Sequence, residues 1–193
     1  MSLQAEAELR CEPFPHTAKM ELISKDLADA TLSWMETDAP WTLRVASFYE
    51  QWELHLGEQT LPLGLASLVA STTVNGLAHA MLRPLTLQQL ELTEVTAHKL
   101  VAGQTIRIHN DYLEGQESHR LLIQLNRGWV DSFGGLLMLF GSAHAEDLRR
   151  AVRPLHCAGF AFAISPQSFH AVSTIQAGQR FTLVYSFRAK SEF

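Results

Sequence analysis

The chain has 193 residues, 47% of them hydrophobic and 18% charged, which is typical of a globular protein with a sizeable core. The formal net charge is −5 and no segment concentrates Lys and Arg, which argues against a nucleic-acid or anionic-membrane surface. The longest apolar runs, such as 134–141, are too short to cross a membrane.

The N-terminus and the cysteines indicate a reducing compartment. The first ten residues, MSLQAEAELR, lack the basic flank and apolar core of a signal peptide. Cys11 and Cys157 form no CxxC pair, so we expect neither a thiolate zinc site nor an Fe–S cluster. A disulfide between them stays open, although a core of this size does not need one. We therefore expect a cytoplasmic protein with one domain over 1–193.

The first half, residues 1–90, is expected to support the core and to form the substrate rim. Apolar residues recur at helical spacing in 18–36, which predicts a helix. Residues 41–56 are rich in aromatic and β-branched side chains and predict a strand. Residues 61–82 again show a helical pattern, closed by Pro84. The aromatic residues of the strand region are expected in the core; they are Trp41, Phe48, Tyr49 and Trp52.

From about residue 91 the hydrophobic period changes to two. Short strands separated by turn signals predict a sandwich or barrel of antiparallel strands, with the early helices covering one sheet from outside. The predicted strands are 91–100, 105–109, 119–126, 134–140, 153–157, 159–165, 170–175 and 180–187.

The segment RIHND, 107–111, places His109 and Asp111 at the end of a predicted strand. Residues i and i+2 project to the same face, so the two side chains can converge on one point. Imidazole and carboxylate together suit Fe(II), Mn(II) or Zn(II), and His170 is the preferred third ligand because it begins a later strand. Two His and one carboxylate form the facial triad of non-haem Fe(II) oxygenases. The alternative is that Asp111 simply opens a turn.

The strand RFTLVYSF, 180–187, carries the second candidate site. Its alternation puts Arg180 and Thr182 on one face. An arginine inside a β fold is costly to bury without an anion, and its guanidinium can bind a carboxylate through two parallel hydrogen bonds. The pattern predicts a carboxylate-binding pair, unless Arg180 lies at the strand start and points to solvent.

Taken in order, four segments resemble the Fe(II)- and 2-oxoglutarate-dependent oxygenases, closest to the prolyl-4-hydroxylase-like branch. The resemblance covers roughly 95–188 and is carried by KLVAGQTIRIHND, LLIQLNRGW, FGGLLMLF and ISPQSFHAVSTIQAGQRFTLVYSF. It implies a mainly β protein with flanking helices and a double-stranded β-helix core, jelly-roll and cupin-like, over 91–188. It implies His109, Asp111 and His170 as iron ligands, and Arg180 with Thr182 as partners of the distal carboxylate of 2-oxoglutarate.

The resemblance also implies a reaction. O2 and 2-oxoglutarate would be consumed, with ascorbate as a further candidate requirement, and an aliphatic C–H would be hydroxylated while 2-oxoglutarate is decarboxylated to succinate. The branch points to a peptide or protein residue, with proline one candidate, and the alternative is a free amino acid or small metabolite. Many relatives have Tyr where this chain has Lys99 and Gln124, positions that usually help to hold 2-oxoglutarate. Gln124 can substitute there as a donor.

Other readings remain to be separated from this one. Neither GxSxG nor HExxH occurs, which argues against a serine hydrolase and a zinc metallopeptidase. A β-helix module that binds metal or ligand without catalysis is a different class, as is a cupin-like isomerase or an O2-using enzyme without 2-oxoglutarate. The mixed-charge segment 144–154 predicts either a lid beside the site or a solvated surface.

Overall fold

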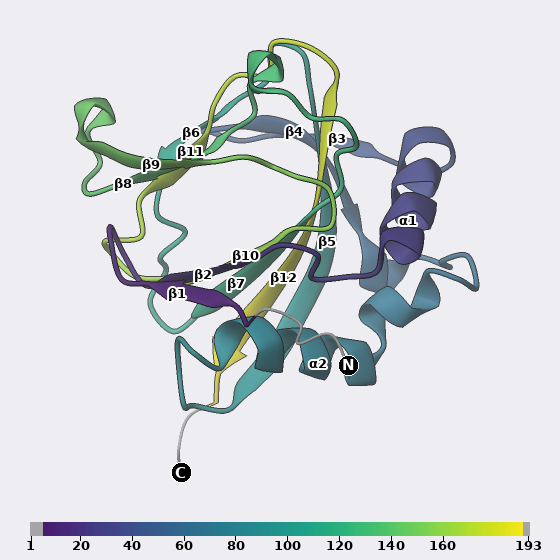
Figure 1. The fold of residues 1–193 in the computed structure, drawn as a ribbon, viewed down its shortest axis with the longest axis horizontal. Helices are drawn as coiled ribbons and strands as arrows, with labels where there is room; N and C mark the ends of the chain where they lie inside the picture. Colours follow the sequence, from purple (N-terminus) through teal and green to yellow (C-terminus); the bar gives the residue numbers. More distant parts are fainter. Residues whose placement is uncertain (1–5, 191–193) are drawn as a thin grey trace.

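The computed structural model describes residues 6–190, in which the strands form a large and a small antiparallel sheet (Figure 1). The strand order of the large sheet is β1 (Glu8–Arg10), β2 (His16–Lys19), β10 (Gly159–Ala163), β7 (His119–Gln124), β12 (Gln179–Ala189), β5 (Leu90–Val101), β4 (Glu50–His55) and β3 (Thr42–Val45). The order of the small sheet is β6 (Ile106–His109), β11 (His170–Val172), β8 (Leu137–Phe140) and β9 (Leu148–Val152).

The two sheets face each other as layers, and the large sheet curves toward the small one at its β4 end (Figure 1). The turn before β4 closes this side, because the Arg107 backbone amide donates to the Phe48 carbonyl at 2.8 Å and Tyr49 forms an isolated bridge with Ile106. The space between the layers is therefore bounded on one side by residues of the first half of the chain.

The α-helices pack against the outer face of the large sheet (Figure 1). Helix α1 (Lys25–Thr37) begins at the N-cap Ser24, whose side chain accepts from the Leu27 amide, and α2 (Ser71–Leu82) follows later in the chain. Short 3₁₀ helices within the described range are Leu56–Glu58 (η1), Ala66–Val69 (η2), Asp131–Phe133 (η3) and Ala145–Asp147 (η4).

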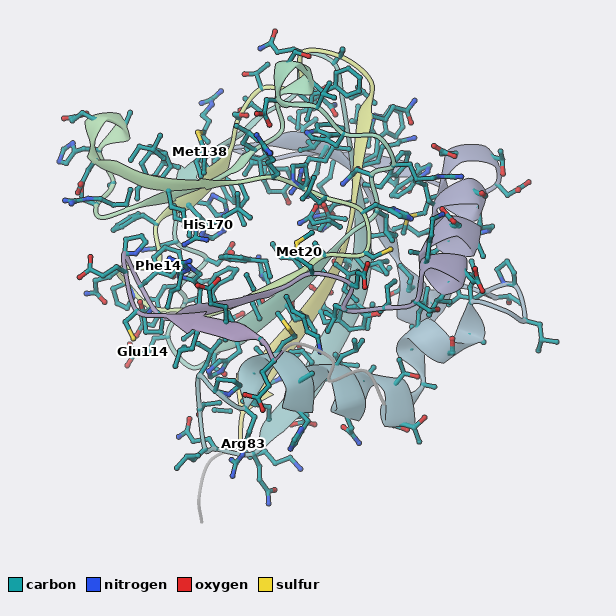
Figure 2. All side chains as sticks on the ribbon, viewed as in Figure 1. Phe14, Met20, Arg83, Glu114, Met138 and His170 are labelled. Atoms are coloured by element: carbon teal, nitrogen blue, oxygen red, sulfur yellow. The ribbon has the colours of Figure 1, made fainter. Side chains whose placement is uncertain are left out.

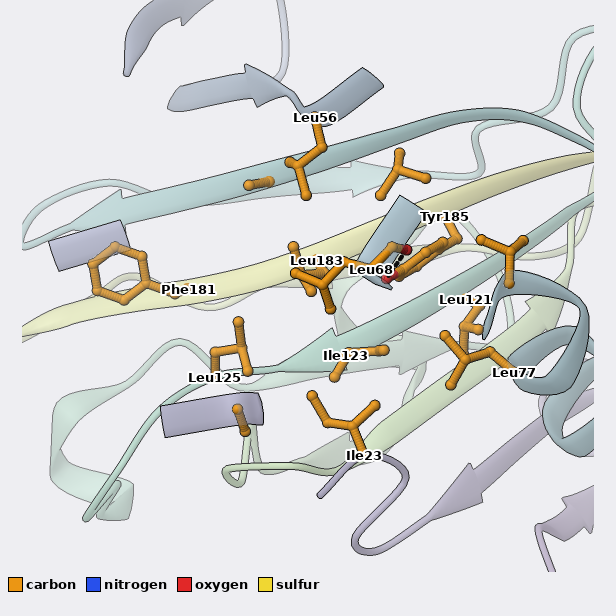
Figure 3. Packing of buried hydrophobic residues seen from close by; sticks show 14 of the residues in the cluster. Ile23, Leu56, Leu68, Leu77, Leu121, Ile123, Leu125, Phe181, Leu183 and Tyr185 are labelled. Carbon is orange, nitrogen blue, oxygen red and sulfur yellow. Dashed lines mark hydrogen bonds between the residues drawn. The ribbon is translucent and has the colours of Figure 1, made fainter. Parts of the chain in front are cut away.

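Side chains of β12 point alternately to the hydrophobic core under the helices and to the space between the two sheets. Phe181, Leu183 and Tyr185 point to the helices and are buried with Ile123 of β7 (Figure 3). The Tyr185 hydroxyl donates to the Leu68 carbonyl at 3.1 Å, the contact dashed in Figure 3. The intervening side chains of β12 necessarily point into the space between the sheets.

Four predicted elements need correction. The helix predicted over 18–36 begins only at Lys25, because 16–19 pairs as β2 with β1 and β10. The strand predicted over 41–56 is two strands, β3 and β4. The helix predicted over 61–82 is regular only from Ser71, after η2.

The last correction concerns 153–157, which was predicted as a strand and forms a turn instead. Pro154 has no backbone N–H for a sheet, and Cys157 adopts a left-handed φ of 67° while its amide donates to the Gln124 carbonyl. The strand here is β9, which pairs with β8, so residues 148–152 of the segment considered as a lid are part of the small sheet.

The structure also shows the state of the two cysteines and the character of the two α-helices. Cys11 is exposed, Cys157 is buried, and both are free thiols. Neither helix within 6–190 has the length and apolar character that a membrane crossing requires.

Candidate active site

His109, Asp111 and His170 meet in the space between the sheets. His109 ends β6 and His170 begins β11, and the two residues are direct partners in the strand register. Their Nε2 atoms lie 3.3 and 3.2 Å from the two Asp111 carboxylate oxygens, and the three donor atoms all fall within 4.8 Å of one another. Figure 2 shows His170 between the two layers. The predicted triad is therefore assembled by strand pairing.

Hydrogen bonds fix the orientation of both imidazoles. The Nδ1 atoms of His109 and His170 lie 2.8 Å from the backbone carbonyls of Arg107 and Ser168. A carbonyl only accepts, so each Nδ1 carries the proton and each neutral ring turns an Nε2 lone pair toward Asp111. Burial lowers the pKa of His170, against the opposing effect of the Asp111 carboxylate. Acceptors that face one another in this way require a cation, so the donor set fits a metal ion.

Arg120 of β7 holds the third donor, Asp111. Its Nη1 donates to Asp111 Oδ2 at 2.7 Å and its Nη2 to Glu117 Oε2 at 2.5 Å. Burial alone would raise the pKa of Asp111, but the Arg120 guanidinium holds this pKa well below its usual range. Asp111 itself has a left-handed φ of 58°, which Asp tolerates better than most residues. The carboxylate is therefore ionised and held in place.

Arg180 lies in the same cavity as the triad and has no anionic partner among residues 6–190. The residue is only 4% exposed, its Nη1 donates to Thr182 Oγ1 at 2.8 Å, and its Nε is buried without a partner. Burial lowers the pKa of Arg180 to about 10. The Thr182 hydroxyl in turn donates a hydrogen bond to Gln124 Oε1 at 3.0 Å. A buried guanidinium with unused donors is suited to an anionic ligand.

The cavity that contains these groups has a volume of about 350 Å³. Residues of β3, β4 and the turn between them line one side, and Phe48 stacks on His109 with ring centroids 4.6 Å apart. A second depression of about 360 Å³ shares Phe48, His109 and Asp111 with the cavity and continues to Tyr112 and Leu113. His109 and Asp111 thus border both hollows, and His170 borders the cavity.

None of the protein-family models matches the sequence, and none of the curated proteins does. Solved structures are similar at low identity. A Pseudomonas putida prolyl-4-hydroxylase has a TM-score of 0.71 at 18% identity, over 91% of this chain and 93% of that one. A Trichoplax adhaerens prolyl hydroxylase, solved with a hypoxia inducible factor oxygen degradation domain peptide fragment, has a TM-score of 0.74 at 11% identity, over 90% and 83%.

A Burkholderia pseudomallei oxidoreductase of the 2OG-Fe(II) oxygenase family has a TM-score of 0.66 at 16% identity, over 89% of this chain and 84% of that one. The chain has the fold of these oxygenases. The predicted double-stranded β-helix with flanking helices is confirmed.

Within this oxygenase fold, Lys99 and Gln124 do not border the cavity as the resemblance suggested. The Lys99 ammonium lies 4.9 Å from the ring centroids of both Trp41 and Trp52, on the outer face of β5. Gln124 lies behind Thr182 and contacts it. The neighbour of Lys99, His98, faces the cavity instead, because alternation along β5 turns it inward.

Sequence reasoning missed several residues of the cavity. Arg120 and Gln124 lie four residues apart on β7 and therefore on the same inward face. The alternation of that strand could have predicted Arg120 as a residue between the sheets. Phe48 and Tyr49 were expected in the core and line the cavity instead. Gln51, Glu53 and His98 carry no motif that the sequence alone would single out.

Proposed function

We propose that the protein is an Fe(II)- and 2-oxoglutarate-dependent dioxygenase that hydroxylates an aliphatic C–H of a peptide or protein residue and decarboxylates 2-oxoglutarate to succinate. One observation carries the proposal: a triad that needs a cation and a buried arginine that needs an anion border the same cavity. Both features lie on a fold shared with such oxygenases.

His109, Asp111 and His170 would hold the iron. When bound, Fe(II) with 2-oxoglutarate supplies the O2 activation that oxidises an unactivated C–H bond. The chain's own residues would orient the metal ligands and exclude water from the site. The Nδ1 bonds keep the imidazoles aligned, and Arg120 fixes Asp111. Apolar side chains that border the cavity keep it dry; they are Leu122, Leu137, Phe162 and Val184.

Arg180 would bind the far carboxylate of 2-oxoglutarate. Two parallel N–H donors of its guanidinium match a carboxylate, and the Thr182 hydroxyl lies beside them. The cost of burying the guanidinium is then compensated only in the liganded protein. This dependence distinguishes the proposal from a cupin-like enzyme that works without 2-oxoglutarate, because such an enzyme has no need for the charge.

The shape of the site favours a peptide substrate over a free metabolite. The depression at Tyr112 and Leu113 shares Phe48, His109 and Asp111 with the cavity, which supports a substrate that extends beyond the residue to be hydroxylated. The exposed fractions of these side chains are 41% and 63%, which leaves them free to contact a substrate chain. A structural relative was solved with a peptide fragment bound.

The decisive experiment is an anaerobic titration with Fe(II) and 2-oxoglutarate, followed by air and a peptide panel. We expect both to bind, succinate to form, and one panel member to gain one oxygen by mass spectrometry. Asp111→Ala is expected to lose Fe(II) affinity and turnover. Glu114→Ala, which removes an exposed carboxylate in the same loop, is the matched control and should retain both.

Three results would contradict the proposal. Succinate formation that survives in Asp111→Ala would place the metal elsewhere. Metal and ligand binding without any succinate would indicate a non-catalytic module. Oxidation of free metabolites while every peptide stays unchanged would exclude the peptide substrate class.

A further inference from the structure

One wall of the cavity is polar although it is buried. We call it the β4 wall and define it as Gln51, Glu53 and His98. Gln51 and Glu53 project inward from β4, while the alternate residue Leu54 packs into the core. His98 on the neighbouring β5 is the register partner of Glu53. Within residues 6–190, no hydrogen bond or ion pair joins these residues to the metal triad.

The hydrogen bonds within the wall leave one acceptor unused. Gln51 is 2% exposed, and its Nε2 donates to Glu53 Oε1 at 2.8 Å and lies 3.4 Å from His98 Nδ1. Its Oε1 atom is buried and has no hydrogen-bond partner among residues 6–190. A buried amide oxygen without a partner costs free energy, so a buried Gln of this kind points to a ligand that donates to it.

The charge of the wall is also only partly compensated. The second Glu53 oxygen has Arg44 Nε at 3.7 Å, and the Arg44 side chain is 63% exposed, so water weakens this pair. His98 adds no positive charge, because burial lowers its pKa to about 4. Its Nε2 lies 3.2 Å from the Thr96 hydroxyl and is already paired. The wall therefore presents an amide oxygen and a carboxylate.

We propose that the β4 wall is a substrate subsite for a side chain with several N–H donors: a primary amide, an ammonium or a guanidinium. The inference rests on the proposed function and names the substrate chemistry that the same cavity selects. Arg180 and the β4 wall have opposite preferences. The arginine attracts the anionic cosubstrate, and Glu53 disfavours it, so the two ligands are directed to different walls.

The test uses the full-length protein with Fe(II), 2-oxoglutarate and air. The probes are blocked peptides Ala-Ala-Xaa-Ala-Ala in which Xaa is Asn, Gln, Lys, Arg, norleucine or Glu. Peptides with N–H-donor side chains are expected to have kcat/KM values at least about tenfold above those of the norleucine and Glu peptides, followed by the gain of one oxygen.

Variants of the wall identify which residues produce the preference. Gln51→Leu is expected to lower kcat/KM of the donor peptides by about tenfold, the effect of losing a hydrogen bond to a charged or amide group. Glu53→Gln should weaken the Lys and Arg peptides more than the Asn and Gln peptides. Glu50→Gln is the matched control, because Glu50 is an exposed residue of the same type on β4 that does not border the cavity, and it should leave all values unchanged.

Measuring the affinity for 2-oxoglutarate distinguishes a failure of the subsite proposal from a failure of the proposed function. Its affinity should be unchanged in Gln51→Leu and strongly reduced when Arg180 is replaced. The subsite is refuted if norleucine or Glu peptides are preferred, if no peptide gains oxygen, or if Gln51→Leu weakens 2-oxoglutarate as much as an Arg180 variant does. Failure of the wild-type protein to bind 2-oxoglutarate contradicts the proposed function itself.

Discussion

Replacing Arg180 by Met is expected to change stability and ligand affinity in opposite directions. Arg180 is 4% exposed, and burial lowers the pKa of its guanidinium from 12.5 to about 10. At ~1.4 kcal/mol for each tenfold change in the ionisation constant, this difference corresponds to about 3 kcal/mol for keeping the charge out of water. No carboxylate of residues 6–190 compensates this free energy in the ligand-free protein. Met is unbranched and fills a similar space without the charge.

We expect Arg180→Met to raise the free energy of unfolding without ligand by about 1–3 kcal/mol, as replacing uncompensated buried charges does. Removing one partner of a buried ion pair costs ~3–5 kcal/mol, so the affinity for 2-oxoglutarate should fall at least about 100-fold. Arg180→Lys should recover part of that affinity, because Lys provides a point charge without the planar fork.

The assay is urea unfolding of the Mn(II)-loaded protein with and without 2-oxoglutarate, together with calorimetric titration of the ligand. In the wild-type protein, ligand at 100 times its Kd should add about 2.7 kcal/mol to the free energy of unfolding, and in Arg180→Met it should add almost nothing. A ligand-free Arg180→Met that is less stable than wild type would refute the reasoning, since the guanidinium would then be paired in the free protein. Unchanged affinity would place the carboxylate pocket elsewhere.

Three further changes test other parts of the structure. Thr182→Val should weaken 2-oxoglutarate by about tenfold in the same titration, because it removes a neutral hydroxyl beside the guanidinium. Burial lowers the pKa of His119 from 6.5 to about 4. Between these pH values the imidazole is protonated in the unfolded chain but not in the folded protein, so the free energy of unfolding falls as the pH drops through that range. His119→Gln should reduce this loss by up to about 3 kcal/mol in urea unfolding measured from pH 7 to 4. Gly134→Ala should destabilise by more than ~2 kcal/mol, because a Cβ there would lie 2.0 Å from a backbone oxygen, whereas Gly115→Ala, also at positive φ but in open space, should cost only about 1 kcal/mol. Equal thermal shifts in the two glycine variants would mean that the close contact is not rigid.

The candidate metal ligands could be predicted because their signal is local. His109 and Asp111 are two residues apart, so strand alternation predicted their convergence. The two side chains do meet, although β6 ends at His109 and Asp111 adopts a left-handed φ of 58°. His170 required a guess about pairing, and the register confirms that it lies opposite His109. The start of α1 could not be predicted in the same way. The helix was predicted from residue 18, but 16–19 forms β2, because β1 and β10 provide hydrogen-bond partners that only the folded chain brings together.

The polar half of the cavity was missed for a different reason. In Glu50–His55, polar and apolar residues alternate, and the usual interpretation of such a strand is one face in the core and one in water. Under that interpretation Gln51 and Glu53 are surface residues. In the structure the apolar face packs toward the helices while the polar face borders the cavity, so both faces are inside the protein.

The same argument unites the two halves of the site. In β12 the outward residues Phe181 and Leu183 are buried under the helices, and the inward residues Arg180 and Thr182 are buried as well. A strand covered on both faces would be most stable with apolar residues throughout, so a polar face retained there carries a free-energy cost that folding alone does not explain. Where that face also leaves donors or acceptors unpaired among residues 6–190, as at Arg180 Nε and Gln51 Oε1, we propose that a ligand is the missing partner. The polar faces of β12 and β4 border one cavity from different strands, and their opposite charge preferences are the reason we propose an anion at one wall and an N–H donor at the other.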